Sequence, residues 1–460
     1  MRISYDIFSK KSIVITLVVL GVLTHAVWFG HPNSAVFDEV HFGKFISAYF
    51  THEYYFDIHP PLGKLVLAAW GWLWGFKPGF SFANIGELYP DNLYMALRFL
   101  PMLAGALLPL VIFGIARQLK LSLPAAALAG ILVALDNALL VQSRLILLDP
   151  FLLLFGFGAL WCYLRSRSLL LQATSYKLQA FLLVCAGLLG GAAMSIKWTG
   201  ITFLGLIIIL EILRLWRDRR LPVIRYSLFV SFASLIVLPS LLYTAVFAVH
   251  FGLLTKSGAG DAFMSARFQS TLTENRYSAD TSLQPIGFFE KAVELNAEMY
   301  RSNQRLTATH PYSSTWYTWP LMARPIFYWV KDTARIYLIG NPLVWWGSTV
   351  AVLVLFLSFI FSGVRSMSNA PLIMAGAWLM NMLPFIGINR VMFLYHYFTA
   401  LIWAILMLAY LVDRSRHARR AVIGISLAAF ALFIYFAPLS YGLSLTDSAY
   451  NNRVWFSSWR

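Results

Sequence analysis

The chain has 460 residues, of which 59% are hydrophobic and only 12% are charged, and its formal net charge at pH 7 is +16. A soluble domain needs roughly a quarter of its residues charged, so the composition excludes a soluble protein and indicates an integral membrane protein. The positive charge is typical of cytoplasmic loops beside anionic lipid, and no nucleic-acid partner is expected. Cys162 and Cys185 both fall in apolar runs, which indicates neither a disulfide nor a cysteine-based metal site.

Apolar runs long enough to cross a bilayer recur along the whole chain. About eleven spans are predicted, at roughly residues 12–29, 92–116, 123–143, 145–164, 178–196, 199–213, 226–250, 342–363, 370–387, 391–411 and 421–439. Basic residues precede the first run and Thr24-His25-Ala26 lies near its end, as in a cleaved signal peptide. Because ten further spans follow, we favour an uncleaved first anchor.

The Lys and Arg residues of the short loops predict the orientation. One set of loops holds Arg2, Lys10, Lys11, Arg117, Lys120, Arg165, Arg167, Lys177, Arg214, Arg217, Arg219, Arg220, Arg225, Arg365, Arg414, Arg416, Arg419 and Arg420. The short loops on the other side carry only Arg144, Lys197 and Arg390. We therefore expect a single membrane domain, 1–460, with a cytoplasmic N-terminus, an outer C-terminus and two long outer loops at about 30–91 and 251–341.

The first outer loop contains two amphipathic stretches, one beginning near Phe37 and one from Pro61 to Trp74, which suit helices lying along the membrane surface. Asp38 and Glu39 place two carboxylates directly after the first span, and His41 lies one helical turn from Asp38. These acids either stabilise a helix start or supply a general base, since an ionised Asp can take a proton from a hydroxyl.

Isolated cations mark the outer ends of several spans. Arg144, Lys197 and Arg390 are predicted there, with Arg98 at the start of the second span. Each side chain could simply extend to lipid headgroups, but four of them beside a carboxylate pair favour a phosphate site. Asp136 and Asp149 could instead neutralise Arg144.

The second outer loop has a helical pattern from about Gly287 to Arg305, followed by HPYSSTWYTWPLMARPIFYW. Its aromatic residues suit sugar rings and membrane interfaces equally well. No Gly-rich phosphate loop and no Asp-x-Asp occurs, so a sugar donor would have to come from the membrane. His41, His52 and His59 with Asp57 could bind a metal, although His-Pro-Pro is more typical of a turn, and no cofactor is expected to be required.

Six segments, in the same order along the chain, resemble the protein O-mannosyltransferases, membrane glycosyltransferases of the GT-C class. They are FDEVHFGKF (37–45), DIHPPLGKL (57–65), SRLILLDP (143–150), SIKWTG (195–200), HPYSSTWYTWP (310–320) and RVMFLYHYFTAL (390–401). The resemblance implies an all-α GT-C fold with about eleven transmembrane helices and an active site on the outer face. It also implies transfer of mannose, with inversion, from polyprenyl-phosphate-mannose to Ser or Thr of secreted or membrane proteins.

The resemblance also assigns residues. It makes Asp38 the base of an acidic pair with Glu39. We expect Glu39 to orient the acceptor or the base, and we assign the donor phosphate to Arg98, Arg144, Lys197 and Arg390. The candidates for substrate contact in these segments are His41, His59, Asp149, His310, Tyr312, Trp316, Trp319, Tyr395 and His396.

Two departures from the family pattern bear on these expectations. The second outer loop lacks the β-trefoil MIR domain of eukaryotic members, as in bacterial ones, which implies a bacterial cell membrane and leaves the acceptor preference open. His25 stands where many relatives carry Arg, which weakens a phosphate role at that position.

Two alternatives stay open at the sequence level. The same fold could pass another sugar, such as aminoarabinose, from a polyprenyl phosphate to a lipid or glycan. A transporter of a lipid-linked sugar would instead predict polar residues at the bilayer midplane and inverted repeats, whereas the polar residues here cluster at the outer edge.

Overall fold

The predicted spans are helices in the computed structural model, which describes residues 9–171, 176–219, 224–305, 309–362, 368–388 and 390–460. Within these residues eight helical segments are long and apolar enough to cross a bilayer, or nine if one bent pair counts as a single span. The helices in the eight segments are α4 (Tyr94–Gln118), α8 (Tyr176–Ile196), α9 (Ile201–Arg217), α10 (Ile224–Phe232) continued by α11 (Leu238–Leu253), α14 (Pro342–Ser362), α15 (Asn369–Met380), α16 (Phe398–Asp413) and α17 (Ala418–Tyr441).

Helices also form at the other three predicted spans. α1 (Lys10–Ala26) and α7 (Asp149–Leu171) lie at the first and fourth predicted spans, and α5 (Leu123–Ala134) with α6 (Asn137–Ser143) makes the bent pair at the third. α1 has only 17 residues and α7 begins with an aspartate. The prediction of a polytopic helical membrane protein is therefore confirmed, while the count of eleven crossings stays a prediction.

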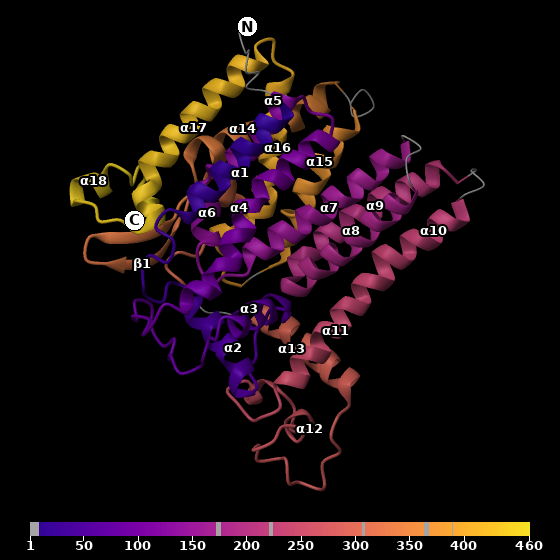
Figure 1. The fold of residues 1–460 in the computed structure, drawn as a ribbon, viewed down its shortest axis with the longest axis vertical. Helices are drawn as coiled ribbons and strands as arrows, with labels where there is room; N and C mark the ends of the chain where they lie inside the picture. The colour runs from indigo at the N-terminus through magenta and orange to yellow at the C-terminus, as the bar shows by residue number, and fades with distance from the viewer. Residues whose placement is uncertain (1–8, 172–175, 220–223, 306–308, 363–367, 389) are drawn as a thin grey trace.

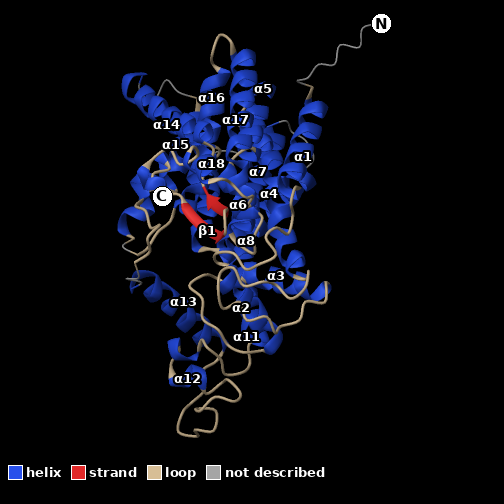
Figure 2. Ribbon diagram, turned by 90° about the vertical axis from the view of Figure 1, so that its left-hand side faces the viewer, coloured by secondary structure: helices blue, strands red, loops and turns tan. Residues whose placement is uncertain are grey.

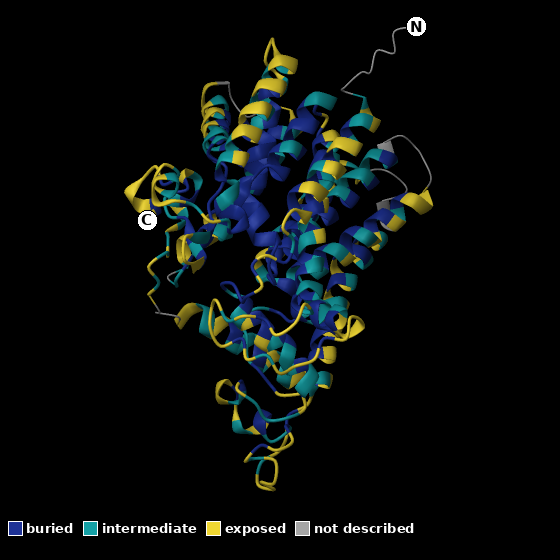
Figure 3. Ribbon diagram, turned by 60° about the vertical axis from the view of Figure 1, so that its left-hand side comes forward, coloured by how far each residue is buried: buried dark blue, intermediate teal, exposed yellow. Residues whose placement is uncertain are grey.

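The helices form one bundle with α16 at its centre. α4 packs against α1, α5 and α7, α7 packs against α8, and α16 packs against α5, α14 and α15. In the span that contains α16, 78% of the apolar window is buried, the largest share among the eight segments, and the bundle interior is the most buried part of the fold (Figure 3). Figure 1 shows α2, α3, α12 and α13 gathered at the end of the molecule opposite to the N-terminus.

The bend between α5 and α6 is 57°. Asp136 lies at this bend, where its Oδ1 accepts the backbone N–H of Leu139 at 2.9 Å and caps α6. Its Oδ2 accepts the indole N–H of Trp345 at 2.8 Å and the backbone N–H of Asn341 at 3.0 Å. The prediction that Asp136 could neutralise Arg144 is therefore wrong, because both carboxylate oxygens are used within the bundle.

The segments at the far end are mostly helical, as predicted. α2 (Glu39–Thr51) and α3 (Leu62–Leu73) coincide with the two amphipathic stretches of the first loop, and α13 (Phe288–Arg305) coincides with the helical pattern of the second. The α12 helix (Ala266–Gln269) lies between α11 and α13, and α18 (Asp447–Asn451) follows α17. The outer-loop boundaries at 30–91 and 251–341 stay predictions.

One β-hairpin was not predicted. β1 (Ile326–Lys331) pairs antiparallel with β2 (Ala334–Leu338), with a bulge between Phe327 and Trp329 (Figure 2). Asp332 in the connection has a φ of +52°, a left-handed conformation that Asp tolerates in tight turns. The hairpin packs beside α6 and α17 and so brings the segment before α14 to the bend of the bundle.

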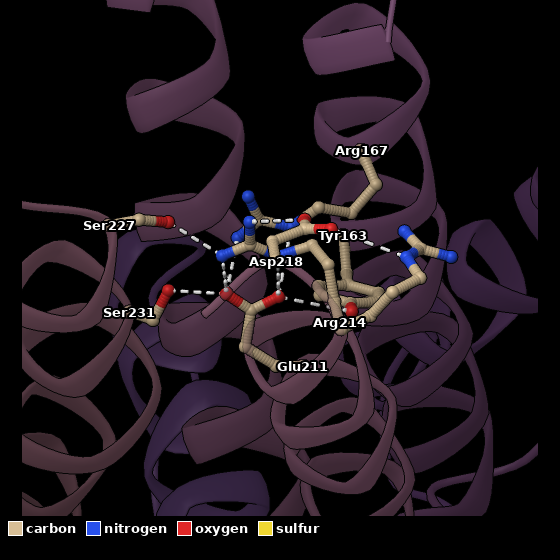
Figure 4. Close-up of polar contacts among 8 residues, drawn as sticks. Tyr163, Arg167, Glu211, Arg214, Asp218, Ser227 and Ser231 are labelled. Atoms are coloured by element: carbon tan, nitrogen blue, oxygen red, sulfur yellow. Dashed lines mark hydrogen bonds and ion pairs between the residues drawn. The ribbon is translucent and has the colours of Figure 1, made fainter. Parts of the chain in front are cut away.

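A buried carboxylate of α9 binds side chains of both α7 and α10. Glu211 of α9 binds Arg214 through Nη2 at 2.7 Å and Arg167 of α7 at 3.1 Å, and the hydroxyl of Ser231 of α10 donates to it at 2.5 Å (Figure 4). The hydroxyl of Tyr163 of α7 also donates to Glu211, at 3.2 Å. Each acceptor oxygen is thus satisfied inside an apolar environment, as a buried ion pair requires.

Candidate active site

Asp38 stands at the start of α2 on a backbone held by the β-hairpin. Its neighbour Phe37 has a φ of +46°, which is unfavourable for a bulky residue and marks a constrained position. The Phe37 N–H donates to the carbonyl of Tyr328 at 3.2 Å, and the two rings stack with centroids 3.9 Å apart. The Asp38 carboxylate itself has no hydrogen-bond partner among the described residues, which leaves it free to accept a proton.

Glu39 points into the protein instead. It is fully buried and binds Arg98, with Arg98 Nη2 2.6 Å from Oε2 and Nε 2.7 Å from Oε1. Its carboxylate also accepts the backbone N–H groups of Val36 and Ile146, each at 2.9 Å, and the hydroxyl of Tyr89 at 3.1 Å. With these bonds, Glu39 fastens the segment between α1 and α2 to the bundle. The structure does not favour its predicted role in orienting the acceptor or the base, because both of its carboxylate oxygens are used within the protein.

The structure does not favour the predicted phosphate role of Arg98. A guanidinium has five N–H donors, and those of Arg98 go to Glu39 and to the carbonyls of Gly30, Pro32 and Ser34 at 2.6–3.0 Å. Because its side chain is fully buried and its donors are used, a phosphate could bind only by displacing these bonds.

Arg144 is likewise used by the protein. Its guanidinium donates to the carbonyls of His25, Val27 and Trp28 at 2.5–2.8 Å, the last carbonyls of α1 and the residues beyond it, and lies 4.6 Å from the Tyr441 ring centroid. It therefore satisfies a helix C-terminus, and we remove both Arg98 and Arg144 from the expected phosphate site. His25 hydrogen-bonds Ser143 at 2.9 Å.

Lys197 and Asp149 form the first ion pair of the site. The Nζ of Lys197 is 2.7 Å from Oδ1 of Asp149, so the prediction that Asp149 could neutralise Arg144 is wrong. The same ammonium lies 5.4 Å from the ring centroid of Tyr395. A cation that still faces an aromatic ring and is partly exposed can bind a further anion.

Lys64 and Asp57 form the second ion pair of the site. Lys64 of α3 is almost fully buried, and its ammonium donates to the Asp57 carboxylate and, at 2.8 Å, to the carbonyl of His59. This pair holds the His-Pro-Pro turn against α3. Sequence reasoning had considered Asp57 only as a metal ligand and had given Lys64 no role.

Arg390 and His396 bring the last matching segment to the same place. Arg390 Nη2 lies 3.4 Å from His396 Nε2, and the His396 ring stacks on Tyr395 at 4.7 Å. Arg390 has no carboxylate partner among the residues that the structure describes. The field of its guanidinium reaches His59, whose pKa is held well below its usual range by burial, by Lys197 and Lys64, and by Arg390. Cations from three segments thus converge around a neutral imidazole.

Burial raises the pKa of Asp38 from its ordinary value near 4 to about 7. The Lys197 ammonium acts in the opposite direction, while the carboxylates of Asp149 and Asp57 add to the rise. A base whose pKa lies near neutral pH suits general-base catalysis.

The matching segment 310–320 contributes unevenly to this site. Trp319 is buried and its ring lies parallel to His396 at 5.8 Å, and His310 meets Phe393 edge-on at 5.0 Å. Tyr312 packs instead on Phe327 of the hairpin, and Trp316 is half-buried beside Tyr317. No hydrogen bond joins any of these four residues to Asp38 in the described part of the chain, and His41 is exposed on α2 one turn beyond Asp38.

No metal centre is assembled in the described part of the chain, where no three His, Cys, Asp or Glu side chains come together. His41, His52, His59 and Asp57 therefore do not form the group that the sequence had left open. His52 instead hydrogen-bonds the carbonyl of Leu253 at 2.8 Å.

Two buried residues that sequence reasoning missed connect these groups. Gln142 of α6 hydrogen-bonds both Asp149 and Tyr328, each at 2.6 Å. Gln142 directly precedes the SRLILLDP segment and Tyr328 lies in a hairpin that was not predicted. Only the contact between these segments, distant in the chain, could have identified them.

Two family models match the chain, one over its first half and one over most of the remainder. The model described as dolichyl-phosphate-mannose-protein mannosyltransferase matches residues 15–255, and the model described as the C-terminal four TMM region of protein-O-mannosyltransferase matches residues 288–459.

Individual members of the family are similar to this chain in sequence and in fold. Dolichyl-phosphate-mannose–protein mannosyltransferase 4 of Candida albicans is 37% identical over 291 residues, which is 61% of this chain and 38% of that protein. The match thus spans less than half the length of this curated relative. The structure of the Saccharomyces cerevisiae protein O-mannosyltransferase Pmt1–Pmt2 complex bound to the sugar donor superposes with a TM-score of 0.89 at 21% identity, covering 98% of this chain and 92% of that one.

A more distant fold match is ArnT from Cupriavidus metallidurans bound to undecaprenyl phosphate, with a TM-score of 0.55 at 14% identity, covering 94% of this chain and 77% of that one. The helical bundle thus places the protein among multi-pass membrane proteins of the GT-C class. Within that class, the chain belongs to the dolichyl-phosphate-mannose–protein mannosyltransferase family. The resemblance drawn from its six segments is confirmed.

Proposed function

We propose that the protein transfers mannose from polyprenyl-phosphate-mannose to Ser or Thr hydroxyls of translocated proteins. The observation that carries this proposal is the pairing of a free carboxylate with free positive charge. Asp38 has no hydrogen-bond partner and Arg390 no carboxylate partner among the described residues, and Lys197 is near enough to Asp38 to shift its pKa. A hydroxyl nucleophile and a phosphate leaving group are the reactants that such a pair serves.

The proposed step is a single displacement with inversion. Asp38 takes the proton of the acceptor hydroxyl while the oxygen of that hydroxyl bonds to the anomeric carbon of mannose. The bond from that carbon to the phosphate oxygen breaks, and the phosphate leaves with the electron pair as polyprenyl phosphate. The transition state is oxocarbenium-like, as in other glycosyl transfers, so one carboxylate is enough.

Lys197 and Arg390 hold the phosphate in this proposal. Phosphate charge increases as the bond to the sugar breaks, and fixed cations aimed at it stabilise that charge. Arg390 can bind in the bidentate manner of a guanidinium, and Lys197 acts as a point charge. We propose substrate contacts for His59, His396 and Tyr395 beside these cations, with Asp149 orienting Lys197. His41 and the aromatic residues His310, Tyr312, Trp316 and Trp319 are proposed for the acceptor and sugar.

We further propose a multi-pass location in a bacterial cell membrane with this site on the outer face. The basic residues of the short loops support this orientation, and the end that carries α2, α3 and α13 lies away from the N-terminus (Figure 1). The acceptor would then meet the enzyme after translocation.

The test uses membranes that contain the protein, polyprenyl phosphate bearing radiolabelled mannose, and a Ser/Thr-rich peptide. We compare the wild-type chain with Asp38→Asn and with Asp280→Asn, an exposed aspartate of the second outer loop. Alkali-labile label on the peptide, lost only in Asp38→Asn, is the expected result. Label on lipid or glycan alone would favour the transferase of another acceptor class, and near-wild-type turnover in Asp38→Asn would refute the assignment of the base.

A further inference from the structure

Gln142 lies at the end of α6, almost fully buried, between two groups of the site. Its amide nitrogen donates to Oδ2 of Asp149 at 2.6 Å, and its amide oxygen accepts the hydroxyl of Tyr328 at 2.6 Å. Both polar ends of the side chain are therefore used by residues far apart in the chain.

Through Asp149, Gln142 is connected to Lys197, a cation of the proposed phosphate site. Asp149 uses its second oxygen, Oδ1, to hold the ammonium of Lys197 at 2.7 Å. Because the two carboxylate oxygens are held by Gln142 and Lys197, the plane of the carboxylate is fixed and with it the place of the ammonium.

Through Tyr328, Gln142 is connected to the backbone that carries Asp38, the proposed base. Tyr328 is almost fully buried, its ring stacks on Phe37 at 3.9 Å, and its carbonyl accepts the Phe37 N–H at 3.2 Å. Asp38 is the next residue. A continuous set of contacts thus joins Lys197 to the start of α2.

We propose that Gln142 is a positioning residue which, through Asp149 on one side and Tyr328 on the other, holds Lys197 and Asp38 in fixed relation to each other. This inference rests on the proposed function, since it gives the cation and the base their roles. A displacement of the reacting groups by about 1 Å can lower a rate roughly 100-fold, so a rigid link between them has a kinetic consequence although Gln142 touches no substrate.

The chemistry of the two neighbours explains why an amide stands here. The ionised Asp149 can only accept a hydrogen bond, and the Tyr328 hydroxyl needs an acceptor for its proton. An amide donates at one end and accepts at the other without charge. A protonated carboxylic acid can do the same, but an ionised one would repel Asp149. Several ionisable groups surround these two neighbours. His25 lines the same small cavity as Gln142, Lys197 is paired with Asp149, and the charges of Asp38 and Tyr395 act on Tyr328.

The experiment compares Gln142→Leu and Gln142→Glu with the wild-type chain in mannosyl transfer between about pH 6 and pH 8. Gln269→Leu removes a buried glutamine of the second outer loop and is the matched control. We expect Gln142→Leu to lower kcat by about 100-fold and to raise the KM of the donor as well, because Lys197 loses its fixed place, while Gln269→Leu stays near wild type in both.

Gln142→Glu distinguishes positioning from a general loss of packing. We divide the activity of each variant by that of the wild-type chain at the same pH. At pH 6 this ratio is expected to be at least about tenfold higher for Gln142→Glu than for Gln142→Leu, because the introduced carboxylic acid then carries a proton and can form both hydrogen bonds. The ratio to wild type removes the titration of Asp38 from the comparison. Gln142→Leu within twofold of wild type, or Gln142→Glu as inactive as Gln142→Leu at every pH, would overturn the inference.

Failure of the proposed function has a different signature. A wild-type chain that transfers no mannose refutes that function, and the link is then judged by equilibrium binding of polyprenyl-phosphate-mannose. Weaker binding in Gln142→Leu than in Gln269→Leu would support the link between Gln142 and Lys197, and equal binding in the two variants would overturn it.

Discussion

The raised pKa of Asp38 predicts how mannosyl transfer depends on pH. Burial sets this pKa at about 7, and a general base works only when ionised, so activity must rise with pH. With a pKa near 7, the ionised fraction increases about tenfold between pH 6 and pH 8, whereas an ordinary aspartate with a pKa near 4 would give no change over that range.

A variant of Lys197 tests whether Asp38 is the group that causes this pH dependence. The Lys197 ammonium lowers the pKa of Asp38, so Lys197→Gln should move the acidic limb of kcat/KM to higher pH. Since Lys197 is also proposed to bind phosphate, the height of the profile should fall as well, but the midpoint of the limb is independent of its height.

The assay is initial-rate transfer to a Ser/Thr peptide at limiting donor, where the pH profile of kcat/KM reports ionisations of the free enzyme. Protein must stay folded across the range, which thermal unfolding at each pH checks. A flat profile from pH 6 to pH 8, or a limb that moves to lower pH in Lys197→Gln, would refute the assignment of Asp38 as a buried base beside Lys197.

Three further perturbations test the charged groups around the bundle. Glu39→Ala leaves the buried Arg98 unpaired and should lower the free energy of unfolding by about 3–5 kcal/mol, measured by chemical denaturation in detergent. Glu211→Ala should cost a similar amount, about 3–5 kcal/mol, because Arg167 and Arg214 lose their carboxylate, yet activity per folded molecule should stay near wild type since Glu211 lies about 15 Å along α9 from its first residue. Arg390→Ala should raise the KM of the donor by about 10- to 100-fold in steady-state kinetics, with Arg390→Lys in between.

The two adjacent acids Asp38 and Glu39 show what the sequence could and could not predict. Composition and apolar runs predicted the membrane bundle, and the six matching segments predicted the family. Spacing could not tell Asp38 from Glu39, because successive residues of a helix point about 100° apart and only the surroundings decide which one faces the site. Glu39 meets Arg98, Tyr89 and two backbone N–H groups, whereas Asp38 faces the site.

The four predicted phosphate-binding cations could not be told apart in the sequence for a related reason. Arg98, Arg144, Lys197 and Arg390 look equivalent in the sequence, since each is a lone charge at the predicted outer end of a span. They differ in the partners that the folded chain brings near each of them, through the bend after α5, the end of α1 and the unpredicted hairpin. Arg144 meets the unsatisfied carbonyls at the end of α1, whereas Lys197 and Arg390 meet one carboxylate between them among the described residues. Tertiary contacts of this kind leave no local pattern in a sequence.

The charges of the site lead to one last prediction about bound donor. Lys197 and Lys64 are already paired with Asp149 and Asp57, so the phosphodiester of the donor, with one negative charge, would be neutralised chiefly by Arg390. Any part of its charge that Arg390 leaves uncompensated disfavours ionisation of Asp38. The pH limb of kcat, which reports the enzyme–donor complex, should therefore lie at higher pH than the limb of kcat/KM. In Arg390→Ala this separation should grow, because the neutralising cation is gone; a separation that shrinks would mean that the phosphate binds elsewhere.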